Sequence, residues 1–344
     1  MTRLKKPPAK SARAKKIGLT YNLKKPGALA DEYEEFDELD TILAIKKEFE
    51  GLGSKVLLFE QDEALASRLA AGRPDLVFNI AEGFGATRGR ESQVPCILES
   101  LGIPYSGSDP VVLGVTLDKY YTSVFLRAHG IPVPQMYMVK SEAELRRVRS
   151  IFSGGKKFIV KPRWEGSSKG IFLKSVVNNC KDLRKRATEV MDAYRQPAVV
   201  EEFLAGEEIT AGVCGNDDLE VLGMMRISPV DIPTKDFLYS IETKRDWRKK
   251  VRYDKEALIS LRTKKAVGTY AAAAFKALEL RDFSRVDFRL DGEGTPRIID
   301  INPLPGLSPA YSDLPILYRL KGGTYSGLIR KILTAVLSRN GFEL

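Results

Sequence analysis

The sequence has 344 residues, 43% of them hydrophobic and 29% charged, which is typical of a water-soluble globular protein with room for two or three domains. The net charge of +10 does not by itself indicate nucleic-acid binding, because residues 1–16 hold seven basic and no acidic residues and the rest carries only +3. No apolar run is long enough to cross a bilayer, and three separate cysteines and one histidine exclude a disulfide framework and a multi-histidine metal site. We expect a cytoplasmic protein with no membrane partner, and nucleic acid is not an expected partner.

Residues 1–16 are rich in Lys, Pro and Ala, a composition that predicts a disordered basic tail. After the tail, short apolar runs alternate with amphipathic segments, which predicts an open parallel α/β domain over residues 17–115. Its expected strands are residues 16–21, 55–60, 75–80 and 103–107, and its expected helices are residues 34–53 and 91–102.

Two further groups of elements predict a central α+β subdomain over residues 116–205 and a C-terminal subdomain over residues 206–344. The expected central elements are helices at 117–130 and 179–194 and strands at 134–139, 158–162, 170–175 and 198–204. The expected C-terminal elements are strands at 207–215 and 220–227, helices at 254–278 and 326–339, and a hairpin at 285–302.

The hairpin carries polar side chains where its core would favour apolar ones. Asp300 and Asn302 are two residues apart on one strand, so their side chains point to the same face. If the hairpin turns near residues 291–294, Asp287 on the other strand reaches that face as well. Three oxygen ligands together suit a hard divalent cation such as Mg²⁺.

A glycine- and serine-rich turn follows the expected strand at 158–162. It contains Gly166, Ser167, Ser168 and Gly170, which allow backbone N–H groups and hydroxyls to approach an anion. Lys161, just before the turn, would add a positive charge to a bound phosphate. The GK[ST] ending of a Walker loop is absent, and a Gly-Ser hairpin without function would look similar.

Two glutamates flank the next turn of the chain. Glu201 ends an apolar strand and Glu208 begins another. They could form structural ion pairs with lysines, or they could hold the adenine and ribose of a nucleotide. Since Mg²⁺ in proteins usually bridges to substrate phosphates, the oxygen cluster, the Gly-Ser turn and these carboxylates together predict one nucleotide site.

These motifs resemble the ATP-grasp carboxylate–amine ligases, and within them the D-alanine–D-alanine ligase family. The similarity runs from about Lys16 to Arg339. It rests on DLVFN (75–79), LESLGIPYSGS (98–108), LDKYYTS (117–123), GIPVP (130–134), VKPRWEGSSKGI (160–171), EEFLAGEEIT (201–210), RVDFRLD (285–291) and DINPLPGLSP (300–309).

The resemblance implies an ATP-grasp fold, with ATP between two antiparallel sheets and with an N-terminal α/β domain attached. Residues at ATP-contacting positions are Lys119, Lys161, Glu165, Gly166, Ser167, Ser168, Glu201, Phe203, Leu204 and Glu208. Asp287, Asp300 and Asn302 match the ligands of two Mg²⁺ ions, for which Mn²⁺ can substitute. The residues matched to catalysis are Arg285, Lys244, Ser167 and Glu34, and Glu35 fits the position of Glu34 nearly as well.

The reaction that this resemblance implies has two steps. One carboxylate attacks the γ-phosphorus of ATP to give an acyl phosphate, and the amine of a second amino acid then attacks that carbonyl. Gly306 and Ser312 match positions that hold the acceptor's carboxylate, although a Pro/Gly-rich loop with a helix N-cap at Ser312 would explain them equally. The family also implies a homodimer formed through the N-terminal domain, and D-alanyl-D-alanine for peptidoglycan as the product.

Several residues depart from the family pattern at the amino-acid end of the site. The usual GGxSxER opening is absent, Glu82 replaces the histidine of LHG, and Arg245 replaces a tyrosine. Lys169 replaces an apolar residue, and Asp300 stands where glutamate is usual. A ligase joining other amino acids for peptide or secondary-metabolite synthesis is therefore the alternative. A nucleotide-binding regulatory protein without catalysis is a third hypothesis, which the retained metal ligands and lysines disfavour.

Overall fold

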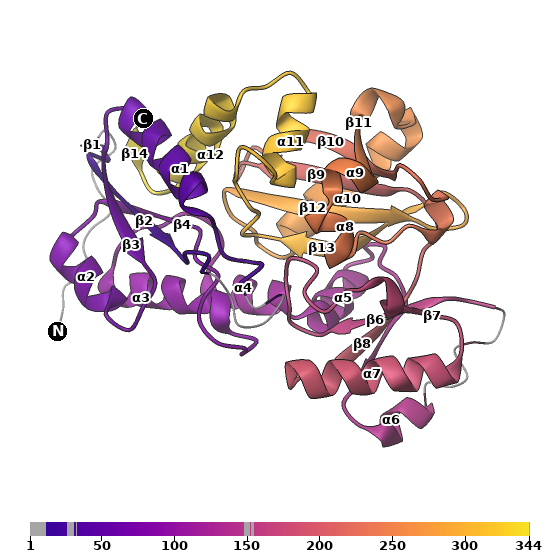
Figure 1. Cartoon of the computed structure of the whole chain (residues 1–344). Helices are drawn as coiled ribbons and strands as arrows, with labels where there is room; N and C mark the ends of the chain where they lie inside the picture. The colour runs from indigo at the N-terminus through magenta and orange to yellow at the C-terminus, as the bar shows by residue number, and fades with distance from the viewer. Residues whose placement is uncertain (1–11, 26–30, 32, 148–151, 153–154, 344) are drawn as a thin grey trace.

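The computed structural model describes residues 12–25, 31, 33–147, 152 and 155–343. Figure 1 shows three parts: an N-terminal domain on the left, a central subdomain at the lower right and a C-terminal subdomain above it. Mixed helix and sheet architecture was predicted from the sequence and is confirmed. No helix of the described residues is both long and apolar enough to span a bilayer.

The N-terminal domain is built on a three-stranded parallel sheet in the order β3-β2-β4. The apolar runs of β2 and β4 are buried: Leu19 of the central strand pairs with Phe78 of β4, and neither side chain is exposed. The edge strand β3 is only partly buried, with Phe59 inside and Leu58 exposed. The bounds are β2 Lys16–Tyr21, β3 Lys55–Glu60, β4 Leu76–Asn79, α1 Leu39–Gly51, α2 Leu65–Gly72, α3 Gln93–Leu101 and α4 Pro110–Leu117.

The central subdomain has a four-stranded antiparallel sheet in the order β5-β8-β6-β7. Leu183, Ala187 and Val190 on one face of α7 belong to the same buried cluster as the strands, so this helix covers one side of the sheet. The bounds are α5 Lys119–Ala128, β5 Met136–Val139, α6 Glu142–Arg147, β6 Phe158–Pro162, β7 Val176–Val177, α7 Cys180–Tyr194 and β8 Ala198–Glu202.

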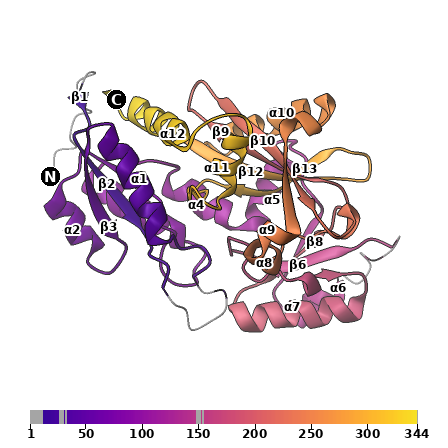
Figure 2. The same cartoon turned by 45° about the horizontal axis from the view of Figure 1, so that its top comes forward.

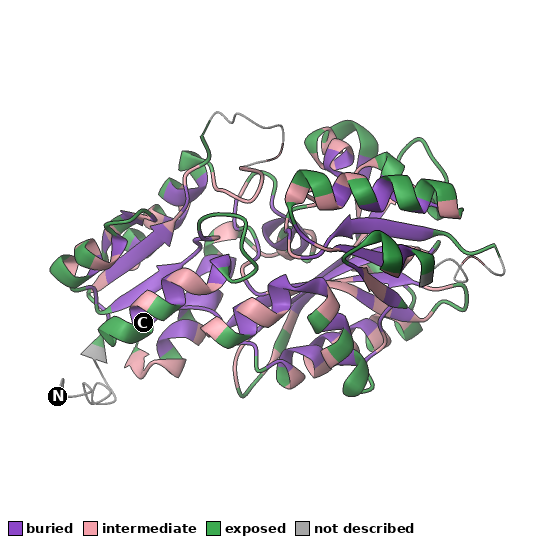
Figure 3. Ribbon diagram, turned by 90° about the horizontal axis from the view of Figure 1, so that it is seen from below, coloured by how far each residue is buried: buried purple, intermediate pink, exposed green. Residues whose placement is uncertain are grey.

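The C-terminal subdomain has a five-stranded antiparallel sheet in the order β11-β10-β9-β12-β13. Helix α10 packs on one face, and α11 and α12 pack on the other, so most of the strands are buried (Figure 3). The bounds are β9 Glu208–Cys214, β10 Glu220–Pro229, α8 Ile241–Arg245, α9 Trp247–Lys250, β11 Val251–Lys255, α10 Leu261–Ala277, β12 Phe283–Leu290, β13 Pro296–Asn302, α11 Asp313–Leu320 and α12 Tyr325–Arg339.

The C-terminal end of the chain packs against the N-terminal domain. Phe78 of β4 stacks on Phe283 of β12 with ring centroids 6.1 Å apart. Strand β1 (Ala12–Arg13) pairs with β14 (Phe342–Glu343), which corrects part of the predicted disordered tail. Backbone pairing with β14 orders residues 12–13, whereas residues 1–11 lie outside the described residues.

Four predicted elements differ from the structure, and side-chain hydrogen bonds account for two of the differences. Residues 103–107 form only an isolated bridge at Tyr105, and residues 170–175 form a turn in which the N–H of Phe172 donates to Ser175 Oγ. The helix predicted over 254–278 begins at Leu261, because Ser260 Oγ accepts the N–H of Thr263. Before it, β11 ends at Lys255 and Glu256–Leu258 form a short 3-10 helix. The helix predicted over 34–53 likewise begins later, at Leu39.

Candidate active site

Two cavities lie where the three parts of the molecule meet. The larger one, about 510 Å³, is lined by the N-terminal domain, the segment containing α8 and α9, and the loop after β13. The smaller one, about 100 Å³, lies between the two antiparallel sheets. Both cavities are lined by Lys119, Ser167, Tyr239, Lys244, Arg285, Asp300 and Asp313. All of the site residues predicted from the sequence line one cavity or the other.

The hairpin of β12 and β13 brings the predicted metal ligands together. In the register of the two strands, Asp287 lies directly opposite Asp300, and Arg285 lies opposite Asn302. The Asn302 side chain donates a 3.2 Å hydrogen bond to Asp287 Oδ2. The described residues hold no group of three His, Cys, Asp or Glu side chains spaced to bind one ion, so a metal site here depends on two carboxylates and one amide.

Positive charges surround Asp300. Its Oδ1 lies 3.4 Å from Lys119 Nζ, at the start of α5. Burial alone would raise the pKa of Asp300, but Lys119, Lys161 and Arg285 outweigh it and hold the pKa below its usual value. The carboxylate is therefore ionised at neutral pH, as a metal ligand must be.

The Gly-Ser turn has a backbone suited to close contact with a ligand. Ser167 and Ser168 have positive φ angles of 47° and 60°. A Cβ at Gly170 would lie 2.4 Å from Pro162 Cγ, so only glycine fits there. Ser168 Oγ donates to the carbonyl oxygen of Tyr239 at 3.1 Å, which ties this turn to the segment before α8. Figure 2 shows α8 beside β6 of the central subdomain.

The end of the smaller cavity that is lined by Glu201 and Glu208 contains a buried carboxylate oxygen that lacks a partner among the described residues. Glu201 is 4% exposed and its Oε1 lies 3.0 Å from Lys161 Nζ, but Oε2 has no hydrogen-bond partner among the described residues. Burial raises the pKa of Glu208 to about 7, although Arg289 lies 3.7 Å away. An orphaned acceptor of this kind fits the exocyclic amine of a purine.

Helix α8 carries Lys244, which the family resemblance matches to catalysis, and Arg245, which departs from the family pattern. The Ser240 side chain caps this helix by accepting the N–H of Thr243. Lys244 lies over the ring of Tyr239, 5.3 Å from its centre, and burial and the charge of Arg285 lower the pKa of Lys244. Arg245 forms an ion pair with Glu34 in the N-terminal domain, its Nε donating to Oε1 at 2.9 Å.

Glu35, which fits the same family position nearly as well as Glu34, has a different environment. Its carboxylate accepts hydrogen bonds from Arg90 and from the Gly166 N–H, each at 2.6 Å. Glu165 pairs with Lys169 at 2.7 Å in the same buried group. The sequence assigned Glu165 to the phosphate loop, and the structure adds that its side chain bonds to protein groups that anchor the loop.

The loop after β13 forms the wall opposite these acids. Ser312 precedes α11, yet its Oγ accepts the N–H of Ser308 at 3.0 Å and makes no cap bond to the helix. A Cβ at Gly306 would lie 2.7 Å from this oxygen, so a larger residue here would displace the Ser312 side chain. Asp313, which we did not predict, lies 3.4 Å from Arg285. Asp313 lies in the first turn of α11, where an acidic residue is common because it interacts favourably with the helix dipole, so the sequence contains no sign of another role.

Comparisons with known proteins agree with this geometry. A family model described as the D-ala D-ala ligase C-terminus matches residues 125–334. The D-alanine–D-alanine ligase of Aquifex aeolicus is 30% identical over 86% of this chain and 94% of its own length. The uncharacterized protein y4sG of Sinorhizobium fredii is 30% identical over 86% of this chain and 85% of the relative. The crystal structure of D-alanine–D-alanine ligase from Bacillus anthracis complexed with ATP shares the fold, with a TM-score of 0.71, 23% identity, and coverage of 95% of this chain and 99% of that one.

Proposed function

This chain belongs to the D-alanine–D-alanine ligase family and is an ATP-dependent ligase, and we propose that it joins two amino acids through an acyl phosphate. The carboxylate of the first amino acid would attack the γ-phosphorus and release ADP. The amine of the second would then attack the resulting carbonyl, forming the amide and releasing phosphate. D-alanine is the substrate that the family indicates.

One observation carries this proposal: the two cavities share a wall made of charged residues. Lys119, Lys244 and Arg285 line both cavities. A phosphoryl group moving from a nucleotide in the smaller cavity to a carboxylate in the larger one would pass between these cations, which stabilise its developing charge. Arg285 is held in place by Asp287 at 2.8 Å, and a donor aimed at the carbonyl oxygen contributes roughly 3 kcal/mol to such a step.

The residues present fit the groups that this chemistry needs. Asp287, Asp300 and Asn302 offer the hard oxygen donors that Mg²⁺ prefers, and Mg²⁺ would neutralise charge on the phosphates when bound. The free oxygen of Glu201 and the carboxylate of Glu208 would hold adenosine. The carboxylate of Glu34 or Glu35 would orient the amine of the first substrate.

A ligase for other amino acids is the second candidate, and a specific observation favours it. The larger cavity is lined by carboxylates from the N-terminal domain, among them Glu82 in place of the family's histidine.

We also propose a cytoplasmic homodimer formed through the N-terminal domain. The exposed Leu39 and Leu43 on α1 support such an interface.

Phosphate release from ATP and Mg²⁺, measured across D- and L-amino acids singly and in pairs, tests the proposal. Release with at least one pair, together with the dipeptide in a mass spectrum, is the expected result. The Asp300→Ala variant should lose at least about a hundredfold in rate, because it removes a metal ligand. Arg262→Ala, an exposed charge on α10, is the control for a substitution away from the site. Phosphate release by Asp300→Ala at the wild-type rate would contradict the metal assignment.

A further inference from the structure

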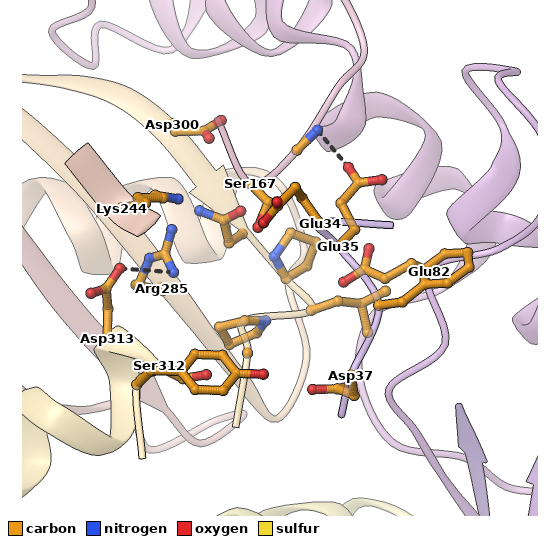
Figure 4. Close-up of a pocket in the computed structure, with 18 of the residues that line it drawn as sticks. Glu34, Glu35, Asp37, Glu82, Ser167, Lys244, Arg285, Asp300, Ser312 and Asp313 are labelled. Carbon is orange, nitrogen blue, oxygen red and sulfur yellow. Dashed lines mark hydrogen bonds and ion pairs between the residues drawn. The ribbon is translucent and has the colours of Figure 1, made fainter. Parts of the chain in front are cut away.

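Three carboxylates of the larger cavity make no direct ion pair among the described residues, although Arg90 and Lys119 are near enough to offset part of the rise that burial causes in the pKa of Glu91. Asp37, Glu82 and Glu91 all line this cavity, and among the described residues no hydrogen bond or ion pair reaches their side chains. Glu91 is only 8% exposed, so the protein has buried a carboxylate without pairing it. They come from three separate segments, and Figure 4 shows Asp37 and Glu82 across the cavity from Lys244 and Arg285.

The neighbouring cations are engaged elsewhere. Arg90 pairs with Glu35 at 2.6 Å and donates to the carbonyl oxygen of Trp164 at 2.7 Å. Lys169 lies 2.7 Å from the carboxylate of Glu165. Of the cations that line the cavity, Lys24 and Arg245 pair with Glu34, and Lys119 pairs with Asp300. In the part of the chain that the structure describes, none of these cations makes an ion pair with the three carboxylates, of which Glu91 is buried and the other two are half-buried.

The electrostatic cost of this arrangement appears in the acidity of the three groups. Burial raises the pKa of Glu91 to about 8 and, together with Glu38, the pKa of Asp37 to about 7. Burial and the charges of Glu91 and Glu35 raise the pKa of Glu82 well above its usual value. Unpaired buried carboxylates are expensive for a fold, and a bound cation would relieve the cost.

We propose that Asp37, Glu82 and Glu91 bind a positively charged side chain of the first amino acid, which makes that substrate a diamino acid. This inference rests on the proposed function and names the substrate class for it. An ammonium on a short flexible chain can reach carboxylates from three segments in a cavity of about 510 Å³. The methyl group of alanine would leave all three carboxylates unpaired.

Isothermal titration calorimetry of the whole chain, with Mg²⁺ and a non-hydrolysable ATP analogue present, tests this assignment. The probes are the D- and L-enantiomers of 2,3-diaminopropionate, ornithine and alanine. At least one diamino acid should bind the wild-type protein ten times or more tightly than alanine of the same hand. The double variant Glu82→Gln/Glu91→Gln should lower that ratio by roughly ten- to a hundredfold, since each charged hydrogen bond is lost. Glu63→Gln, an exposed carboxylate of the same domain, should preserve it.

Equal affinities of the wild-type protein for diamino acids and alanine would overturn the assignment without any variant. A ratio that survives the double variant would do the same, as would competition between Mg²⁺ and the diamino acid, which would mean that the carboxylates hold a metal. Phosphate release separates this failure from failure of the ligase proposal. If the wild-type protein releases phosphate with alanine and does not prefer a diamino acid, it is a ligase, and only the proposed substrate class is wrong. Release with no amino-acid pair refutes the ligase proposal itself, and the calorimetric ratio still decides the cation site.

Discussion

Glu35 accepts a hydrogen bond from the backbone N–H of Gly166 at 2.6 Å, although 131 residues separate them in the sequence. The same carboxylate oxygen accepts from Arg90, whose guanidinium also donates to the carbonyl oxygen of Trp164. The turn that we propose to contact the phosphates of ATP is thus held from the N-terminal domain. This contact therefore joins the N-terminal domain, which lines the proposed amino-acid cavity, to the turn that we propose to contact the nucleotide.

Replacing Glu35 with glutamine should loosen this connection. The pKa of Glu35 is lowered, because Arg90, Lys169 and the Gly166 N–H outweigh its burial, so the group is ionised at neutral pH. Glutamine removes the charge and leaves Arg90 buried with a weaker partner, which should reduce the free energy of unfolding by on the order of 3 kcal/mol. The KM for ATP should rise several-fold. Urea unfolding and steady-state ADP release measure the two effects.

Glu63→Gln is the matched control, because it makes the same substitution at an exposed position of the same domain. Both its unfolding free energy and its KM for ATP should match the wild type. If Glu35→Gln is less stable yet has an unchanged KM for ATP, the contact supports the fold alone and does not position the turn.

The parts of the fold that the sequence predicts best are those determined by neighbouring residues. Strand alternation places Asp300 and Asn302 on one face. The turn at residues 291–295 sets the pairing of Phe288 with Ile298, and a register shift between Asp287 and Phe288 then brings Asp287 opposite Asp300. Short apolar runs likewise predict β2 and β4, since strands buried on both faces have few polar positions, and the apolar run of β3 predicts an edge strand that is only partly buried. The strands and the shared face of Asp300 and Asn302 depend on local spacing, which the sequence contains directly, whereas the register shift beside Asp287 was not predicted.

Contacts between distant segments could not be predicted in this way. Nothing local in the acidic stretch at residues 31–40 distinguishes Glu35, which binds the Gly-Ser turn, from Glu34, which pairs with Arg245. Glu91 also looks like an ordinary helix-start acid until the fold places it against the larger cavity. Long-range packing decides which of several similar carboxylates is buried, and the sequence alone does not specify that packing.

Replacing Arg245 with tyrosine, the residue usual at this position in the family, should change the choice of acceptor. The Arg245 side chain is 44% exposed, so its ion pair with Glu34 contributes less than about 1 kcal/mol and stability should change little. Its charge, however, lines the larger cavity and would attract an acceptor with a second carboxylate. The ratio of kcat/KM for an acidic acceptor over alanine should fall about tenfold. Arg262→Tyr on α10 should leave this ratio unchanged. If Arg245→Tyr also leaves the ratio unchanged, Arg245 does not determine the choice of acceptor.

Glu208 should make the stability of the free protein depend on pH. Its pKa is raised by burial from 4.5 to about 7, so the folded state keeps a proton that the unfolded state releases above pH 4.5. The stability that this proton provides is complete below pH 4.5 and is lost as pH rises toward 7, by up to roughly 3 kcal/mol. Glu208→Gln removes the titration, so its unfolding free energy minus that of the wild type should increase over this range and level off above it. Urea unfolding at a series of pH values measures the difference, in which other titrating groups cancel. A difference that stays flat from pH 4 to 8 would show that Glu208 is already ionised in the folded protein.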